Sequence, residues 1–266
     1  MSAGEWLTYE APGRTIRAYA SKPNISAPWP AVIIIHGVNG CGEHMWNVAD
    51  DFAKDGYFAV CPDIYSFDKE FESIPNDDII AAAHSGPFSS KAKEFLAAQT
   101  PERREAIMKA RVWIDKRPTE TFIDIIYAAY EYLKGRKDVG AVGCMGFCMG
   151  GRLTGELAVT GADIAAGVIY YGGHPKLELV SKIKCPLEGH YGELDKGITG
   201  KVPDFDAAMK AAGKDFHYFV YENAEHGFSL KPGTRSYKHD AAALSFARTK
   251  EFFAKNLKTA VLRAAE

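Results

Sequence analysis

A cysteine framed by glycines follows an apolar run near the middle of the sequence. The segment Gly146-Phe147-Cys148-Met149-Gly150 has the form G-x-C-x-G. This is the pattern of a nucleophile elbow, a strand-to-helix turn, with cysteine in the position where serine is more common. Such a turn strains the backbone of the nucleophile and leaves no space for a Cβ atom two residues before or after it. The pattern therefore predicts that Cys148 is a nucleophile at the N-terminus of a helix, whose N–H groups favour a thiolate.

Two further side chains are predicted to act together with Cys148, because of their order in the chain. A bare G-x-C-x-G also fits a packing turn around an inert cysteine, so the order of the other groups carries the argument. Asp195 follows the strand-like run Cys185–Tyr191, and His226 follows the run Phe216–Tyr221. The order nucleophile, acid, histidine is that of the α/β-hydrolase catalytic triad. We therefore predict a triad of Cys148, His226 and Asp195.

Other polar residues near these positions have different interpretations. Glu193 lies in the same turn as Asp195 and is the alternative acid. His190 lies within a strand-like run and is interpreted as a core histidine. Cys41 and His44 lack a second pair of ligands at metal spacing, so we expect no metal site. The glycines near the elbow do not form a dinucleotide-binding motif, so we expect no dinucleotide site at that turn.

The loop after the first buried run is expected to complete the site. The run Pro30–His36 leads directly into a turn that contains two glycines. In an α/β-hydrolase, the oxyanion hole takes one N–H from the residue after the nucleophile, here Met149, and one from this loop. We favour Val38 as the second donor, with Gly37 next. His36 is interpreted as a residue that orients the loop, because His226 already occupies the place of the base.

Alternating strand-like and helix-like runs predict the elements that position these groups. The expected strands are Trp6–Tyr9, Thr15–Ala20, Pro30–His36, Tyr57–Cys61, Val139–Cys144, Ile164–Tyr171, Cys185–Tyr191 and Phe216–Tyr221, and the expected helices are 44–54, 119–134, 153–159, 204–212 and 241–257. This order predicts a mostly parallel, doubly wound sheet of the α/β-hydrolase type, with an N-terminal antiparallel hairpin. The charged, helix-prone stretch 66–118 predicts a helical excursion over one edge of the sheet.

Composition narrows the classes of protein that remain. The chain has 266 residues, with 32 Lys and Arg against 34 Asp and Glu, and we expect a single domain over residues 1–266. The near-neutral net charge gives no indication of a basic surface that would bind nucleic acid. The longest apolar run, Ala31–Ile35, is too short for a membrane span, and no leader pattern is present at the N-terminus. Five cysteines without a repeated spacing indicate reduced thiols. We expect a cytoplasmic monomer or weak homo-oligomer.

Several of these segments together resemble the dienelactone hydrolase family. The matching segments are Gly56-Tyr57, Cys61-Pro62-Asp63-Ile64-Tyr65, Gly146-Phe147-Cys148-Met149-Gly150-Gly151, Tyr170-Tyr171-Gly172, the turn ending in Asp195, and Ala224-Glu225-His226-Gly227-Phe228. They lie between about residues 30 and 255, and the elbow is the most specific of them. The resemblance implies an α/β-hydrolase fold and hydrolysis of small esters or lactones by a thiol, without a cofactor.

Two positions depart from what this resemblance implies. Enzymes that open dienelactone are expected to carry a glutamate beside the resting thiol, where this chain has Gly37. They are also expected to carry an arginine four residues after the catalytic histidine, where this chain has Leu230. Arg235, Arg103 or Arg104 could replace that arginine as the group that binds a substrate carboxylate. The natural substrate is therefore left open.

The expected activity is cleavage of a carboxylic ester or lactone through a thioester acyl-enzyme. Tyr170 and Tyr171 follow a strand and are expected either to line the acyl pocket or to pack as core aromatics. An acyltransferase or thioesterase with the same triad is one alternative function. A ligand-binding relative without catalysis is the other alternative.

Overall fold

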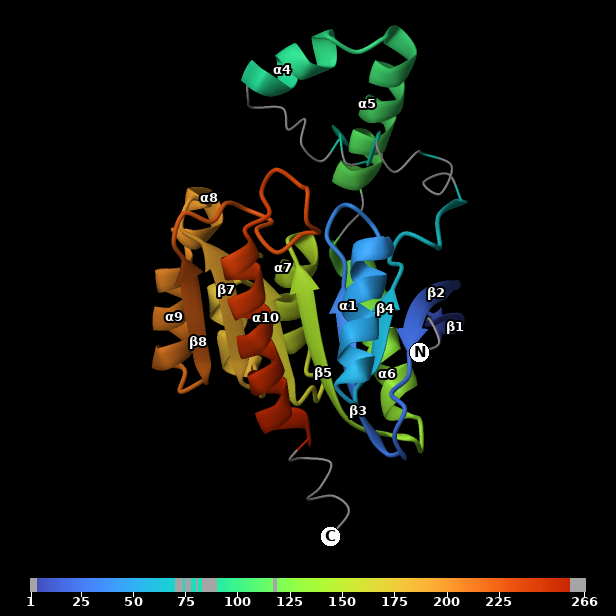
Figure 1. The fold of residues 1–266 in the computed structure, drawn as a ribbon, viewed down its shortest axis with the longest axis vertical. Helices are drawn as coiled ribbons and strands as arrows, with labels where there is room; N and C mark the ends of the chain where they lie inside the picture. Colours follow the sequence, from blue (N-terminus) through green and yellow to red (C-terminus); the bar gives the residue numbers. More distant parts are fainter. Residues whose placement is uncertain are drawn as a thin grey trace.

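The computed structural model describes residues 4–69, 74, 78–79, 81–82, 90–116 and 119–258. This part of the chain is built on a sheet of eight strands, in the order β1-β2-β4-β3-β5-β6-β7-β8 (Figure 1). The strands are β1 (Glu5–Ala11), β2 (Arg14–Ser21), β3 (Trp29–Ile35), β4 (Phe58–Pro62), β5 (Val139–Phe147), β6 (Ala166–Tyr170), β7 (Leu187–Gly192) and β8 (Phe216–Tyr221). All eight predicted strands are confirmed.

Helices fill most of the connections between these strands. They are α1 (Glu43–Lys54), α4 (Ser90–Ala97), α5 (Pro101–Lys116), α6 (Thr119–Lys134), α7 (Met149–Ala158), the 3-10 helix η1 (Leu177–Lys182), α8 (Lys196–Thr199), α9 (Val202–Ala211), α10 (His239–Phe253) and the π-helical turn η2 (Ala254–Lys258). None of the described helices combines the length and the apolar composition needed to cross a membrane.

The hairpin and the parallel strands both follow from the local sequence. Gly13 has φ +70° and supplies the turn between β1 and β2, where Ala11 pairs with Arg14. β2 is also antiparallel to β4, whereas the remaining neighbouring strands are parallel. The residues of the β3 run Ala31–Ile35 are fully buried, because both faces of the strand are covered. The mostly parallel sheet predicted from the sequence is therefore confirmed.

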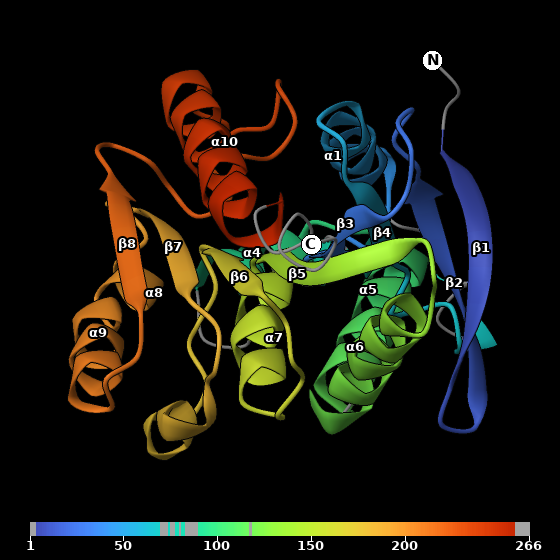
Figure 2. The ribbon, with the colours of Figure 1, turned by 90° about the horizontal axis from the view of Figure 1, so that it is seen from below.

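Helices cover both faces of the sheet, and each face has its own core. Figure 2 shows α1 and α10 on one face and α6, α7 and α9 on the other. Ile33 belongs to the core that contains Ile125 of α6. Its neighbour Ile34 belongs to the opposite core, with Phe52 of α1 and Phe253 of α10. Successive side chains of a strand point to opposite faces, so β3 stabilises both layers.

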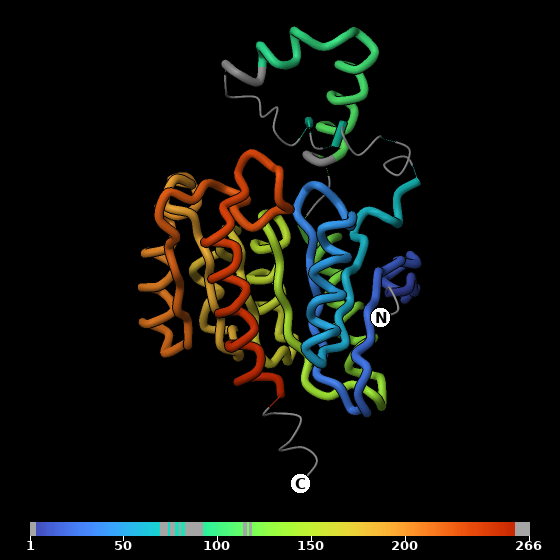
Figure 3. The backbone as a smooth tube through the Cα atoms, in the orientation of Figure 1, coloured from blue at the N-terminus to red at the C-terminus, as the bar shows by residue number. Residues whose placement is uncertain are grey.

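The predicted excursion over residues 66–118 contains the helices α4 and α5, which cover most of its described residues, whereas residues 66–68, 74 and 98–100 lie outside helices. Its helices α4 and α5 lie over the carboxyl ends of the parallel strands (Figures 1 and 3). Trp113 in α5 packs edge-on against Tyr65 at 5.3 Å, and its Nε1 donates to Asp68 at 2.7 Å. Residues 70–73, 75–77, 80, 83–89, 117 and 118 lie outside the described part. The excursion thus stands at the end of the sheet that carries the loops after the strands.

One element boundary at the elbow differs from the sequence prediction. β5 continues to Phe147 instead of ending at Cys144, whereas α7 begins at Met149, directly after Cys148, as the elbow pattern predicts. The residues between Cys144 and Phe147 include Gly146, which carries no apolar pattern. Their structure depends on contacts with other strands, which the local sequence does not reveal.

Candidate active site

Cys148 occupies a strained turn between β5 and α7. It has φ +55° and ψ −114°, and it is one of three non-glycine residues with positive φ in the described part. A Cβ atom on Gly146 would collide with the carbonyl of Gly150, and a Cβ on Gly150 would collide with that of Ile35. Glycine is therefore required on both sides of the cysteine. The half-buried Cys148 sits at the N-terminus of α7, where the first backbone N–H groups of a helix have no intrahelical partner.

Asp195 and His226 meet on the loops that follow β7 and β8. The Nδ1 atom of His226 lies 2.6 Å from Oδ2 of Asp195, and the two side chains are 41% and 12% exposed. Partial burial lowers the pKa of His226, but hydrogen bonds and charges from Asp195 and Cys148 outweigh it and raise the pKa to about 10. The imidazole thus interacts with both other members of the predicted triad.

Glu193, the alternative acid, has a different partner. Its carboxylate accepts the backbone N–H of Asn223 at 2.9 Å, where the chain turns with φ +51°. The next N–H, that of Leu194, donates to the carbonyl of Ala224 at 2.9 Å. These two bonds join the loop that carries Asp195 to the loop that leads to His226. Glu193 therefore fastens the two loops together, while Asp195 contacts the imidazole.

The two tyrosines at the end of β6, Tyr170 and Tyr171, have different surroundings in the structure. Tyr171 has φ +37°, and its ring centroid lies 5.1 Å from that of His226. Its hydroxyl is 3.0 Å from the Ser229 hydroxyl, which fixes the orientation of the buried ring. The Tyr171 ring therefore packs against one side of the imidazole. Tyr170 is fully buried in the core, with its hydroxyl 2.8 Å from Thr249. Of the two interpretations given for these tyrosines, Tyr171 lies beside the predicted triad, whereas Tyr170 is a core aromatic.

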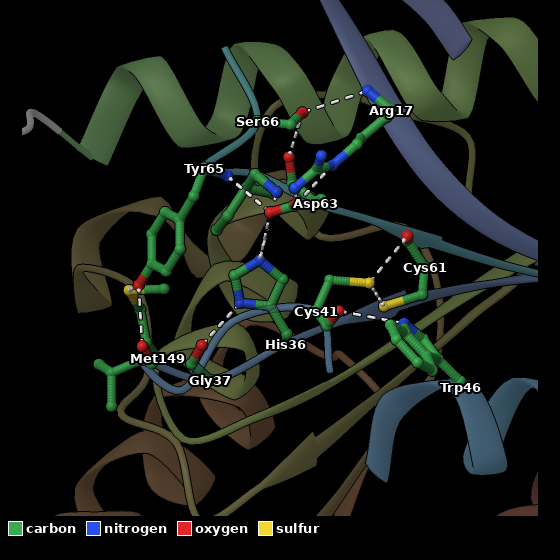
Figure 4. Close-up of polar contacts among 12 residues, drawn as sticks. Arg17, His36, Gly37, Cys41, Trp46, Cys61, Asp63, Tyr65, Ser66 and Met149 are labelled. Atoms are coloured by element: carbon green, nitrogen blue, oxygen red, sulfur yellow. Dashed lines mark hydrogen bonds and ion pairs between the residues drawn. The ribbon is translucent and has the colours of Figure 1, made fainter. Parts of the chain in front are cut away.

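The loop after β3 lies against the elbow and is oriented by His36. The His36 side chain is fully buried, and burial lowers its pKa against the opposing effects of Asp63 and Gly37. Its Nε2 accepts the N–H of Ile64 at 3.2 Å, so the proton is on Nδ1, which donates to the Gly37 carbonyl at 2.6 Å (Figure 4). That carbonyl and the Val38 N–H belong to one trans peptide and point in opposite directions. His36 therefore fixes the direction of the Val38 N–H.

Tyr65 has a role that the sequence analysis missed. Its buried hydroxyl lies 3.4 Å from the Val38 carbonyl and 3.9 Å from the Met149 sulfur, so it touches both residues expected to form the oxyanion hole (Figure 4). The Tyr65 N–H is held by the Asp63 carboxylate at 3.2 Å, and Asp63 pairs with Arg17 at 2.9 Å. The segment Cys61–Tyr65 belongs to the family resemblance, which was the available signal, but local sequence assigns it no role.

The three arginines considered as carboxylate-binding groups each have a partner outside the triad. Arg103 lies 3.3 Å from Asp78, and Arg104 donates to three backbone carbonyls at residues 96, 97 and 99. Arg235 is 91% exposed and lies 3.9 Å from Glu225. Among the described residues, no cluster of three or more His, Cys, Asp or Glu side chains is arranged to hold a metal ion.

The chain is similar to known proteins in three respects: it matches a family model, it has relatives in sequence, and solved structures share its fold. The model of the dienelactone hydrolase family matches residues 16–257. A Saccharolobus solfataricus protein named “Putative carboxymethylenebutenolidase” is 29% identical over 252 residues, which are 92% of this chain and 96% of the relative. The crystal structure of a “Putative Dienelactone Hydrolase” from Klebsiella pneumoniae has a TM-score of 0.72 at 22% identity, over 94% of this chain and 98% of that one. A dienelactone hydrolase-like promiscuous phosphotriesterase from metagenomic libraries has a TM-score of 0.67 at 20% identity, over 95% and 98%. These two structures share the fold of this chain.

Proposed function

The chain belongs to the dienelactone hydrolase family, a family of ester and lactone hydrolases, and we propose that it cleaves a small carboxylic ester or lactone with Cys148 as its nucleophile. The match over most of the chain confirms the resemblance seen in the sequence. One observation carries the proposed mechanism. His226, bonded to Asp195 at 2.6 Å, also interacts with a cysteine whose φ is +55° at a helix N-terminus.

The first half-reaction forms a thioester. His226 takes the proton of Cys148, and the thiolate sulfur attacks the carbonyl carbon of the substrate. The backbone N–H groups of Met149 and Val38 stabilise the oxyanion, each by about 3–4 kcal/mol. As the tetrahedral intermediate collapses, the bond to the leaving oxygen breaks, and His226 returns the proton to that oxygen. Asp195 holds the imidazole in the tautomer that this exchange requires.

The second half-reaction releases the acid. His226 removes a proton from water, and the resulting hydroxide attacks the thioester carbonyl. The same two N–H groups bind the second oxyanion. Collapse breaks the carbon–sulfur bond, and Cys148 recovers its proton from His226. For a lactone, the alcohol and the acid remain parts of one product.

Turnover of a chromogenic ester tests this mechanism. The purified full chain is mixed with excess p-nitrophenyl acetate, and p-nitrophenol is counted per protein molecule. We expect many turnovers for the wild type and for the control Cys144→Ala, whose thiol is buried in β5. We expect hydrolysis by Cys148→Ala to fall to the background rate. Full activity of Cys148→Ala contradicts the assignment of the nucleophile, and a single equivalent of p-nitrophenol from the wild type indicates a ligand-binding protein.

A further inference from the structure

Two cysteines outside the proposed triad face each other next to the oxyanion loop, defined here as residues 37–40. The Sγ atom of Cys41 lies 3.3 Å from Sγ of Cys61 and 3.5 Å from the Cys61 carbonyl oxygen (Figure 4). Both cysteines are free thiols. A disulfide has a sulfur–sulfur distance of about 2.05 Å, so the two atoms need to approach by only about 1.2 Å to form one.

The two thiols differ in their exposure and in their freedom to move. Cys61 is fully buried in β4, where it pairs with Tyr19 of β2, and burial raises the pKa of its thiol well above the ordinary value. Cys41 is half-buried and directly follows the loop, between Gly40, which has φ +81°, and Gly42. An oxidant from solvent therefore meets Cys41 first. When the sulfurs approach, we expect the loop to move more than the strand, because β4 is held by strands on both sides.

We propose that Cys41 and Cys61 form an oxidative modification site that reacts with hydroperoxides, and that its disulfide impairs the oxyanion hole. In the first step, the Cys41 sulfur attacks hydrogen peroxide, the O–O bond breaks, and one oxygen stays on sulfur as a sulfenic acid while the other leaves as water. In the second step, the Cys61 sulfur attacks the Cys41 sulfur. The S–S bond forms, the S–OH bond breaks, and hydroxide leaves with the Cys61 proton as a second water. A reducing thiol reverses the modification by exchange.

The oxyanion loop connects the pair Cys41 and Cys61 to the proposed oxyanion donor, the Val38 N–H. Cys41 lies three residues after Val38, and the turn between them is closed by a hydrogen bond from Gly40 N–H to the Gly37 carbonyl at 3.2 Å. That carbonyl belongs to the peptide whose N–H is the proposed donor. A displacement of about 1 Å at such a group lowers the rate by up to about 100-fold. This second part of the inference rests on the proposed function, whereas disulfide formation does not.

Peptide mapping tests the modification site itself. The reduced full chain is treated with hydrogen peroxide, free thiols are blocked with iodoacetamide, and the protein is digested without reductant. We expect a linked pair of peptides that contains Cys41 and Cys61, with a mass lower by two hydrogens. We also expect Cys144 and Cys185 to remain free thiols, since each is buried. Absence of the linked pair under conditions that oxidise Cys148 would overturn the proposal.

The activity measurement compares the wild type with Cys41→Ser. Serine keeps a donor toward the Cys61 carbonyl, and we expect the reduced variant to match the wild type in ester hydrolysis. Oxidation of Cys148 is measured in the same digest, so that the two proteins are compared at equal loss of the nucleophile. The wild type should then lose a further 10- to 100-fold in kcat and recover it with dithiothreitol. Equal losses in the two proteins would overturn the effect on the oxyanion hole. If neither protein hydrolyses esters, the proposed function fails, and the mapping still decides whether the disulfide forms.

Discussion

Gly37 lies directly against Cys148: a Cβ atom built on Gly37 would be 3.3 Å from the Cβ of Cys148. The same atom would lie 3.2 Å from the carbonyl oxygen of Phe147. The oxyanion loop and the elbow are therefore in contact at the position where the family resemblance leads us to expect a glutamate. A side chain at residue 37 would meet the nucleophile, so this position controls the electrostatic surroundings of the thiol.

Introducing a carboxylate at this position should slow the chemistry of the thiol. We expect Gly37→Glu to react with iodoacetamide about tenfold more slowly at neutral pH, because a neighbouring negative charge disfavours the thiolate. The matched control is Gly37→Gln, which has the same size without the charge. If the two variants are alkylated at the same rate, steric contact rather than charge governs the effect.

Asp195→Asn should lower kcat by about two to four orders of magnitude, because the imidazole loses its orienting carboxylate. The control is Glu193→Gln, whose amide oxygen can still accept the Asn223 N–H and hold the loops together. Steady-state kinetics on a neutral ester give kcat for both variants, and circular dichroism verifies that they fold. A harmless Asp195→Asn together with a damaging Glu193→Gln would show that the acid is assigned to the wrong residue.

Elements with a strong apolar pattern were predicted from the sequence almost residue by residue. The helix α6 (Thr119–Lys134) and the strand β8 (Phe216–Tyr221) have the predicted bounds, because their buried side chains repeat at helical or strand spacing. The elbow pattern predicts the turn at Cys148, but the apolar pattern ends its strand at Cys144, three residues early. Gly146 illustrates the cause, since it pairs with Ile35 of β3, a residue more than one hundred positions away. Glycines required by such distant contacts leave no periodic signal.

The candidate site likewise contains residues that the sequence predicts and residues whose contacts only the tertiary structure reveals. The three side chains of the predicted triad lie together, because the order of the strands places their loops at one end of a parallel sheet. The groups that support them were found only in part. His36 was interpreted as orienting the loop, but its bond to the Ile64 N–H joins residues 28 positions apart. The contacts of the Tyr65 hydroxyl with Val38 and Met149 likewise depend on tertiary packing, which no local pattern reveals.

The raised pKa of His226 predicts a pH dependence of stability. Its pKa is about 10 in the folded chain against an ordinary value of 6.5, so the folded state holds this proton more tightly than the unfolded state. The resulting stabilisation is fully present below about pH 6.5 and is lost as the pH rises to about 10. Because the side chain is 41% exposed, solvent screening keeps the effect small.

Urea unfolding of the wild type and of His226→Gln at several pH values measures this contribution. The control variant retains every other titrating group, so the difference between the two proteins isolates His226. We expect the free energy of unfolding of the wild type to decline more steeply between about pH 6.5 and pH 10. Parallel declines would mean that His226 does not hold its proton in the folded chain.

His36→Ala should lower kcat by about 10- to 100-fold with little change in KM, because the Gly37–Val38 peptide loses the donor that fixes its direction. Alkylation of Cys148 by iodoacetamide does not form an oxyanion, so its rate should remain that of the wild type. Measuring both rates on the same preparation separates a positioning role from general damage to the site. A parallel loss of alkylation and hydrolysis would show that His36 supports the whole elbow instead.

The residues near His226 predict which substrate charge the site prefers. Leu230 stands where an arginine is expected in enzymes that bind an anionic lactone, and its N–H turns back to the Gly227 carbonyl at 3.0 Å, next to His226. The nearby Arg235 is 91% exposed and faces Glu225. We therefore expect the wild type to hydrolyse neutral esters at least as well as carboxylate-bearing lactones. Leu230→Arg should raise kcat/KM for a carboxylate-bearing lactone by about fivefold relative to a neutral ester, since an ion pair at a partly exposed site contributes about 1 kcal/mol. Leu230→Met preserves the apolar packing and should leave the ratio unchanged. A wild-type preference for anionic lactones that Arg235→Ala abolishes would assign the carboxylate to Arg235 instead.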